Sequence, residues 1–142
     1  MISKAALTRV SRVVEIARAL KPLKATGKPF HVTACYRKNK LISIGWNDYR
    51  HFHPAKRFGA YMGYKQSRDK YIPGRHSEIA AILNSGQTDF SDITFINVRI
   101  NNSDNIDIAK PCPNCSRVLI DQLCVKSIIY TKTDGSVDII KP

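Results

Sequence analysis

The sequence is poor in acidic residues and has no long apolar segment. Only 11 Asp and Glu oppose 23 Lys and Arg, which leaves a formal net charge of +12 and a pI near 9.8. No window approaches the roughly 18 apolar residues of a membrane-spanning helix, and no signal peptide is visible at the start. We therefore expect no membrane partner and a cytoplasmic location, and the positive charge favours polyanionic partners without identifying them.

Cysteine is too sparse for a disulfide framework. The chain has four Cys in 142 residues, and two of them stand in Pro111-Cys112-Pro113-Asn114-Cys115. This spacing is typical of metal binding in an intracellular protein. The length predicts a single domain over residues 1–142, large enough to bury a core without disulfides.

Two short stretches supply the residues that carry chemistry. The thiolates of Cys112 and Cys115 can both reach one tetrahedral zinc ion, and His76 can supply a third ligand. Three protein ligands leave the fourth position to water, as in catalytic zinc sites, so we expect one zinc per chain. Glu78 follows His76 by two residues and is placed to move protons.

Other roles for these residue types stay open from the residues alone. Cys35 or Cys124 could close a structural zinc site as a fourth ligand. Otherwise both are expected to be ordinary buried thiols. His51 and His53 suggest a second metal, but no Cys or acidic partner is near, so a solvated or hydrogen-bonded pair is favoured.

The stretches His76-Ser77-Glu78 and Pro111-Cys112-Pro113-Asn114-Cys115 match the pattern of zinc nucleobase deaminases at every fixed position. Their separation in the chain also suits that pattern, so the chain resembles the cytidine deaminase superfamily. This resemblance implies a three-layer α/β fold, a five-stranded mixed sheet flanked by helices. It also implies that Glu78 is the proton shuttle and that backbone groups at Ser77 and Pro111 hold the base. Family members often complete their sites from neighbouring subunits, so a homo-oligomer is compatible with it.

Hydrophobic periodicity predicts the order of the elements. Helices are expected over residues 3–20 and 75–83 and from the cysteines onward, with Pro22, Gly27 and Pro29 ending the first. Strands are expected over 30–37, 41–46, 94–100, 125–131 and 137–140, and 101–110 is expected to be a polar loop. The apolar stripe predicted for the first helix is Leu7, Val10, Val13, Val14 and Ala17, and the one after the cysteines is Cys115, Val118, Leu119 and Leu123.

The tail bears on the branch of the superfamily. The residues Thr133-Asp134-Gly135-Ser136 between two β-rich runs predict an antiparallel hairpin. Members that resemble free-cytidine deaminases end in such a hairpin, whereas deoxycytidylate and tRNA-adenosine members insert a helix and run the last strands parallel. The tail has no room for that helix. The resemblance therefore leans toward the cytidine deaminase branch, which also contains bacterial toxin deaminases that act on polynucleotides.

The stretch after the second expected strand holds the candidate substrate contacts. The residues Ile44-Gly45-Trp46-Asn47 resemble a Gly-x-Asn segment of several deaminase branches, which implies that Asn47 binds the substrate sugar; a turn asparagine is the alternative. An insertion at about 48–74 follows. The range 47–75 holds seven basic side chains and six of the twelve aromatics, which suits stacking on bases and neutralising phosphates. Lys65, Arg68 and Lys70 are the candidate phosphate contacts. The alternative for the insertion is that its aromatic side chains pack against one another as a small satellite core.

These features together predict a zinc-dependent hydrolytic deaminase that converts cytosine to uracil. The expected substrate is single-stranded nucleic acid or a phosphorylated nucleotide, because of the basic, aromatic insertion. Cytosine is favoured over adenine by analogy with the hairpin-ended branch. Two alternatives stay open: a deaminase of free cytidine or deoxycytidine, and a non-catalytic zinc-containing module that binds nucleic acid.

Overall fold

The computed structural model of the protein describes residues 2–24, 27–48 and 76–142. The elements in chain order are α1 (Lys4–Lys24), β1 (Phe30–Arg37), β2 (Lys40–Trp46), α3 (Ser77–Ser85), β3 (Ile93–Ile100), β4 (Ile106–Asp107), α4 (Pro113–Arg117), the π-helical segment η1 (Val118–Gln122), β5 (Ser127–Thr131) and β6 (Val137–Ile140). The predicted strands of β1, β2, β3 and β6 agree with these bounds to within one residue. The remaining predicted strand, 125–131, corresponds to β5, which begins two residues later than expected.

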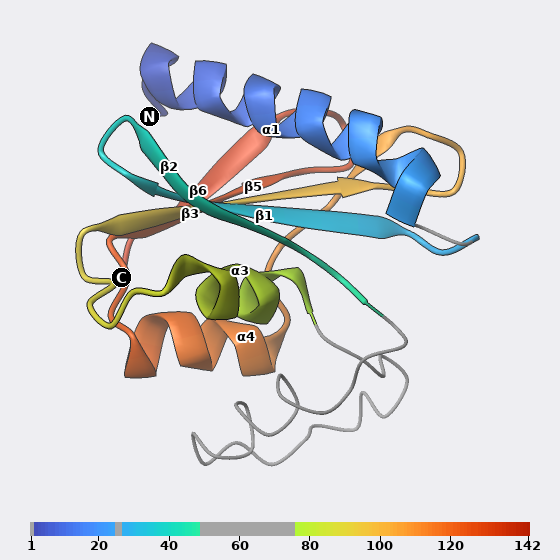
Figure 1. Ribbon diagram of the computed structural model, residues 1–142. Helices are drawn as coiled ribbons and strands as arrows, with labels where there is room; N and C mark the ends of the chain where they lie inside the picture. Colours follow the sequence, from blue (N-terminus) through green and yellow to red (C-terminus); the bar gives the residue numbers. More distant parts are fainter. Residues whose placement is uncertain (1, 25–26, 49–75) are drawn as a thin grey trace.

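The strands form one mixed sheet between two layers of helices. Its order is β2-β1-β3-β5-β6, with β4 paired to β3, and only β3 and β5 are parallel. The helix α1 covers one face, whereas α3 and α4 share the other (Figure 1). The predicted three-layer α/β fold is confirmed. The predicted count of five strands was one short, because two residues of β4 are too few to show an alternating pattern.

The first helix runs further than predicted. Pro22 lies inside α1 and does not end it, although proline removes one backbone hydrogen bond in the last turn. Side chains of that turn anchor it instead: Lys21 Nζ donates to Asn101 O at 2.9 Å and Arg18 Nη1 donates to Asp104 O at 2.8 Å. The predicted apolar stripe was wrong at Leu7, which is 43% exposed, because Ala6 turns toward the sheet in its place.

The helix α3 packs directly on the backbone of β2. A Cβ at Gly45 would lie 2.2 Å from Ala81 N and 2.5 Å from Ser77 O, so only glycine allows this crossing. The helix ends at Gly86 in the left-handed conformation, as its Asn-Ser-Gly sequence predicts. The close approach fixes the start of α3, which carries two of the predicted site residues.

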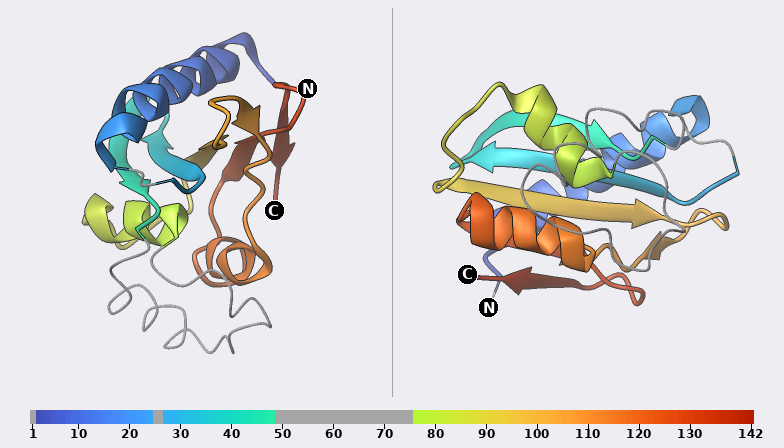
Figure 2. Two further views of the ribbon diagram at one scale, coloured as in Figure 1. Left: turned by 90° about the vertical axis from the view of Figure 1, so that its right-hand side faces the viewer. Right: turned by 90° about the horizontal axis from the view of Figure 1, so that it is seen from below.

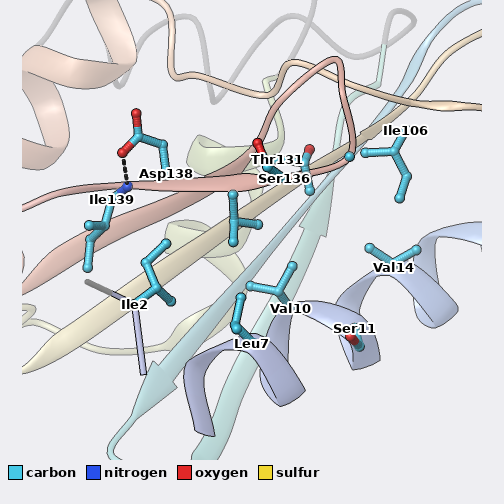
Figure 3. Close-up of a pocket in the computed structure, with 12 residues that line it drawn as sticks. Ile2, Leu7, Val10, Ser11, Val14, Ile106, Thr131, Ser136, Asp138 and Ile139 are labelled. Atoms are coloured by element: carbon cyan, nitrogen blue, oxygen red, sulfur yellow. Dashed lines mark hydrogen bonds between the residues drawn. The ribbon is translucent and has the colours of Figure 1, made fainter. Parts of the chain in front are cut away.

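The predicted terminal hairpin is confirmed. The strands β5 and β6 are antiparallel, with Thr131 opposite Val137. Between this hairpin and α1 lies a largely apolar pocket of about 660 Å³ (Figure 3). Its lining includes Leu7, Val10, Val14, Ile106 and Ile139, and it lies on the face of the sheet opposite α3 and α4.

Several predictions fall on residues outside the described ranges. These are the insertion at 48–74 beyond Asp48, the pair His51 and His53, and the phosphate contacts Lys65, Arg68 and Lys70. The single-domain prediction stays a prediction for the same reason. Within the described ranges, no helix is both long and apolar enough to cross a lipid bilayer.

Candidate metal centre and active site

The two motifs meet where α3 and α4 begin. His76 is the N-cap of α3 and Cys112 is the N-cap of α4, and both helices start at the same end of the sheet (Figures 1 and 2). The ring atom Nδ1 of His76 lies 3.5 Å from Cys112 Sγ and 3.3 Å from Cys115 Sγ. The three potential ligand atoms all lie within 4.8 Å of one another. This group could therefore hold one metal ion.

The spacing of these atoms fits a tetrahedral zinc ion. With Zn–S near 2.3 Å and Zn–N near 2.05 Å, tetrahedral angles place ligand sulfur and nitrogen about 3.6 Å apart. The two sulfur-to-nitrogen distances, 3.3 and 3.5 Å, are slightly shorter than this value. Two thiols and an imidazole are also the donor set that zinc prefers. These two distances would therefore lengthen only slightly around a bound zinc ion.

The two other cysteines stand apart from this group. Cys35 lies in β1 and is fully buried, and burial raises the pKa of its thiol to about 12. Cys124 was predicted to be buried and is instead exposed; it lies in the turn between η1 and β5, with a left-handed backbone conformation (φ 52°). Among the described residues, the metal-binding group contains three side chains and no fourth.

The start of α4 favours ionisation of Cys112. Its Sγ accepts the backbone N–H of Cys115 at 3.4 Å. A hydrogen bond from the Cys115 thiol lowers the pKa of Cys112 to about 4, against the opposing effect of burial. The same hydrogen bond and burial raise the pKa of Cys115. Zinc binds the thiolate form of cysteine, so metal binding must displace the proton that Cys115 retains most strongly.

Glu78 lies in the first turn of α3 and is only 6% exposed. Its Oε1 accepts from Ser77 Oγ at 3.1 Å, and its Oε2 accepts from Asn97 Nδ2 at 3.1 Å. Burial raises the pKa of the carboxyl, although the nearby His76 acts in the opposite direction. A held carboxyl with a raised pKa, next to a metal-binding group, is suited to taking up and returning a proton.

The predicted base-holding residues lie beside the metal ligands. Ser77 is buried and separates His76 from Glu78 in the chain. Pro111 is also buried, precedes Cys112, and its carbonyl accepts from Ser116 Oγ at 3.3 Å. Their contacts to a base stay predictions.

Asn47 makes two hydrogen bonds to the start of β1. Its Oδ1 accepts from His31 N at 2.9 Å, and its Nδ2 donates to Pro29 O at 3.1 Å. These bonds are those of a structural asparagine, which was the alternative interpretation of this residue. Its contact with a substrate sugar stays a prediction.

Sequence reasoning missed three polar residues on the face of the sheet that α3 covers. Thr33 and Asn97 are buried at 0% and 3% exposure and face each other across β1 and β3. His31 precedes Thr33 on the same face of β1, and burial, then Arg99, then His76 lower its pKa to about 4. A signal existed for two of them, since Thr33 and Asn97 stand in the middle of otherwise apolar strands, where Asn in particular is uncommon.

Comparison with known proteins finds likeness in structure and not in sequence. No known protein-family profile matches this chain, and no curated protein matches it. A cytidine deaminase from Burkholderia pseudomallei superposes with a TM-score of 0.55 at 15% identity, covering 92% of this chain and 91% of that one. A dCMP deaminase from the cyanophage S-TIM5, in its apo form, superposes with a TM-score of 0.50 at 16% identity, covering 90% and 86%. The chain thus has the cytidine deaminase fold over about nine-tenths of its length, with both signature stretches of that superfamily brought to one site.

Proposed function

We propose that the protein is a zinc-dependent hydrolytic deaminase that converts cytosine and water to uracil and ammonia. One observation carries this proposal: the buried carboxyl of Glu78 stands at the start of the same helix as His76, which is in contact with both thiols. A purely structural zinc site has no use for such a carboxyl, and burying it without function costs stability. The fold shared with two deaminases supports the same assignment.

The residues divide the chemistry between them. Zinc, when held by His76, Cys112 and Cys115, supplies a Lewis acid that makes water reactive near neutral pH. Glu78 accepts the proton of the attacking water on a carboxyl oxygen and passes it to the ring nitrogen of the base. The carboxyl then assists the departure of ammonia from the ring carbon that bore the amino group and that the water attacked. Its hydrogen bonds from Ser77 and Asn97 keep both oxygens in place during these transfers.

For the substrate, we propose cytosine in single-stranded nucleic acid or in a phosphorylated nucleotide. The support is the net charge of +12 and the aromatic and basic residues of 47–75, both taken from the sequence. Free cytidine is the second candidate. It is favoured by the antiparallel hairpin of β5 and β6, since the branch of nucleoside deaminases ends in this way.

A substrate panel with one matched pair of variants tests the proposal. Cytosine, cytidine, deoxycytidine, their monophosphates, and single-stranded DNA and RNA are assayed for uracil formation. Glu78→Gln is expected to keep zinc and fold yet lose about 10² to 10⁴ in rate, because only proton transfer is removed. Glu15→Gln changes an exposed carboxyl on α1, on the other face of the sheet, and is expected to retain full activity. Wild-type protein that binds zinc but forms no uracil from any of these compounds would exclude the assignment.

A further inference from the structure

Four buried polar side chains, Thr33, Ser77, Glu78 and Asn97, form a closed hydrogen-bonded ring. Thr33 Oγ1 lies 2.8 Å from Ser77 Oγ and 2.8 Å from Asn97 Oδ1. Ser77 Oγ lies 3.1 Å from Glu78 Oε1, and Asn97 Nδ2 lies 3.1 Å from Glu78 Oε2. All four residues are at most 6% exposed. The ring thus links β1, β3 and α3 through the one carboxyl that the proposed reaction uses.

Packing alone does not explain this ring. Thr33 and Asn97 are opposite each other in the register of β1 and β3, on the face that α3 covers. Apolar side chains of similar shape would fill the same space without needing partners, and buried polar groups cost stability unless all are paired. The neighbours of the two residues on this face, Cys35 and Phe95, belong to the apolar core. On the other side of the pair the same face continues with His31 and Arg99, so Thr33 and Asn97 stand where the apolar core meets polar side chains.

The ring has fewer hydrogens than contacts. The four contacts need four hydrogens, but Thr33, Ser77 and one amide hydrogen of Asn97 supply three. With an ionised Glu78, Ser77 and Asn97 both donate to the carboxylate, and Thr33 can donate to only one of its two neighbours. The other contact of Thr33 then joins two acceptors.

Each oxygen of the Glu78 carboxyl has one donor in the ring. Ser77 Oγ donates to Oε1 and Asn97 Nδ2 donates to Oε2. Thr33 Oγ1 lies within hydrogen-bond distance of both Ser77 Oγ and Asn97 Oδ1, and it therefore joins the two donors from below. Such chains of hydrogen bonds polarise one another and strengthen in a buried environment.

We propose that Thr33 and Asn97 are positioning residues of Glu78, and that their ring holds both carboxyl oxygens in one orientation during turnover. This inference rests on the proposed deaminase function, in which Glu78 takes up a proton and returns it. Thr33 and Asn97 act through Ser77 and Glu78, to which their side chains are hydrogen-bonded. The ring provides a fixed set of donors and acceptors at the moment of transfer.

The first test separates turnover from binding. In Thr33→Val the side-chain shape is kept and the hydroxyl is lost, whereas Thr33→Ser retains the hydroxyl. The matched control is Thr94→Val, which removes a hydroxyl that lies 2.9 Å from Ser127 Oγ, outside the ring. With cytidine and deoxycytidine monophosphate as probes, Thr33→Val is expected to lower kcat at least tenfold, about 1.4 kcal/mol, with KM within twofold and zinc content unchanged. Thr33→Ser is expected to recover to within threefold of wild type, and Thr94→Val to keep the wild-type kcat.

Equal kcat in wild type and Thr33→Val would overturn the inference while leaving the proposed function intact. A merely structural role is also excluded by the predicted pattern, because a loosened fold would lower zinc content or raise KM as well. If the wild type deaminates none of the compounds in the panel, the proposed function fails on its own evidence.

The second test needs no activity. Glu78→Gln places an amide at the same position, so Gln Nε2 can donate to Ser77 and Gln Oε1 can accept from Asn97, which completes the ring. The zinc-loaded Glu78→Gln protein is therefore expected to unfold several degrees above wild type. In the Thr33→Val background this gain is expected to shrink by at least half, which a double-mutant cycle measures. A gain of the same size with and without the Thr33 hydroxyl would contradict the ring.

Discussion

Gly45→Ala is expected to disrupt the site without touching a single ligand. A Cβ at this position would lie 2.2 Å from Ala81 N, 2.5 Å from Ser77 O and 2.7 Å from Ala80 C. Ordinary van der Waals contacts begin near 3.4 Å, so α3 and β2 must separate by more than an ångström. All three atoms are backbone, and no side chain can rotate away to make room.

The expected magnitudes follow from this displacement. Inserting a methyl group into a packed interior costs about 1–3 kcal/mol, and rigid backbone on both sides favours the upper end. For a domain of this size, about 3 kcal/mol lowers Tm by about 10 °C. The shift also carries His76 and Glu78, at the start of α3, away from Cys112 and Cys115. A misplacement of about 1 Å at reacting groups lowers the rate by about 10²-fold.

The control is Gly86→Ala at the other end of the same helix. Gly86 has φ 64° with nothing within 4 Å of the added Cβ, so only backbone strain of about 1–2 kcal/mol is introduced. Thermal unfolding, zinc content and rate are measured for both variants. We expect Gly86→Ala to lose some stability and keep its zinc and rate, and Gly45→Ala to lose all three. If Gly45→Ala unfolds at the wild-type temperature and retains zinc, the close backbone approach of α3 to β2 at Gly45 is contradicted.

Four further predictions concern the metal, the spare cysteines, pH and salt. Cys112→Ala or Cys115→Ala is expected to lose zinc, as measured by elemental analysis. If free zinc is present at a thousandfold over its Kd, the loss of zinc lowers the free energy of unfolding by about 4 kcal/mol. A wild-type protein whose Tm does not change when zinc is removed by a chelator would contradict this. Replacing Cys35 and Cys124 together by Ala is expected to leave zinc content unchanged, because neither belongs to the metal-binding group; zinc loss in that variant would show a closed structural site. The folded protein holds the pKa of His31 near 4, below its ordinary 6.5, so the unfolded chain takes up the proton first as the pH falls. The free energy of unfolding is therefore expected to decrease by up to about 3 kcal/mol between pH 6.5 and pH 4. Urea unfolding of His31→Gln is expected to lack this part of the loss. Replacing Lys65, Arg68 and Lys70 by Ala is expected to raise KM for an oligonucleotide and to leave cytidine turnover unchanged. The slope of log K against log salt concentration for oligonucleotide binding is expected to decrease in magnitude by about 0.7 per lost phosphate contact. An equal effect on both substrates would favour free cytidine as the substrate.

Much of the fold could be predicted from local patterns. The strands Phe30–Arg37 and Ile93–Ile100 are apolar runs of β-formers, and the Asp-Gly turn near the end indicated the hairpin of β5 and β6. The end of α1 was predicted wrongly, since a proline at residue 22 is a stop signal by local rules. Contacts from Lys21 and Arg18 to the loop after β3 override that signal. The two-residue strand β4 had no local signal at all.

The sequence by itself determined the chemistry that this protein can offer. His76, Glu78, Cys112 and Cys115 were recognisable because ligand type and spacing along the chain are local properties, and the start of a helix after each motif is also a local property. The same holds for the excess of positive charge, which depends on composition alone.

Only the tertiary structure decided how these groups are used. The two motifs are far apart in the chain, at 76–78 and 111–115, and their meeting depends on α3 and α4 starting at the same end of one sheet. The partners of Glu78 depend on the register of β1 against β3, which places Thr33 opposite Asn97 beneath α3. That register is set by the whole sheet, because a shift of one residue would turn both side chains to the other face. Asn47 likewise received its structural bonds from the neighbouring strand, which nothing in its own stretch of sequence specifies.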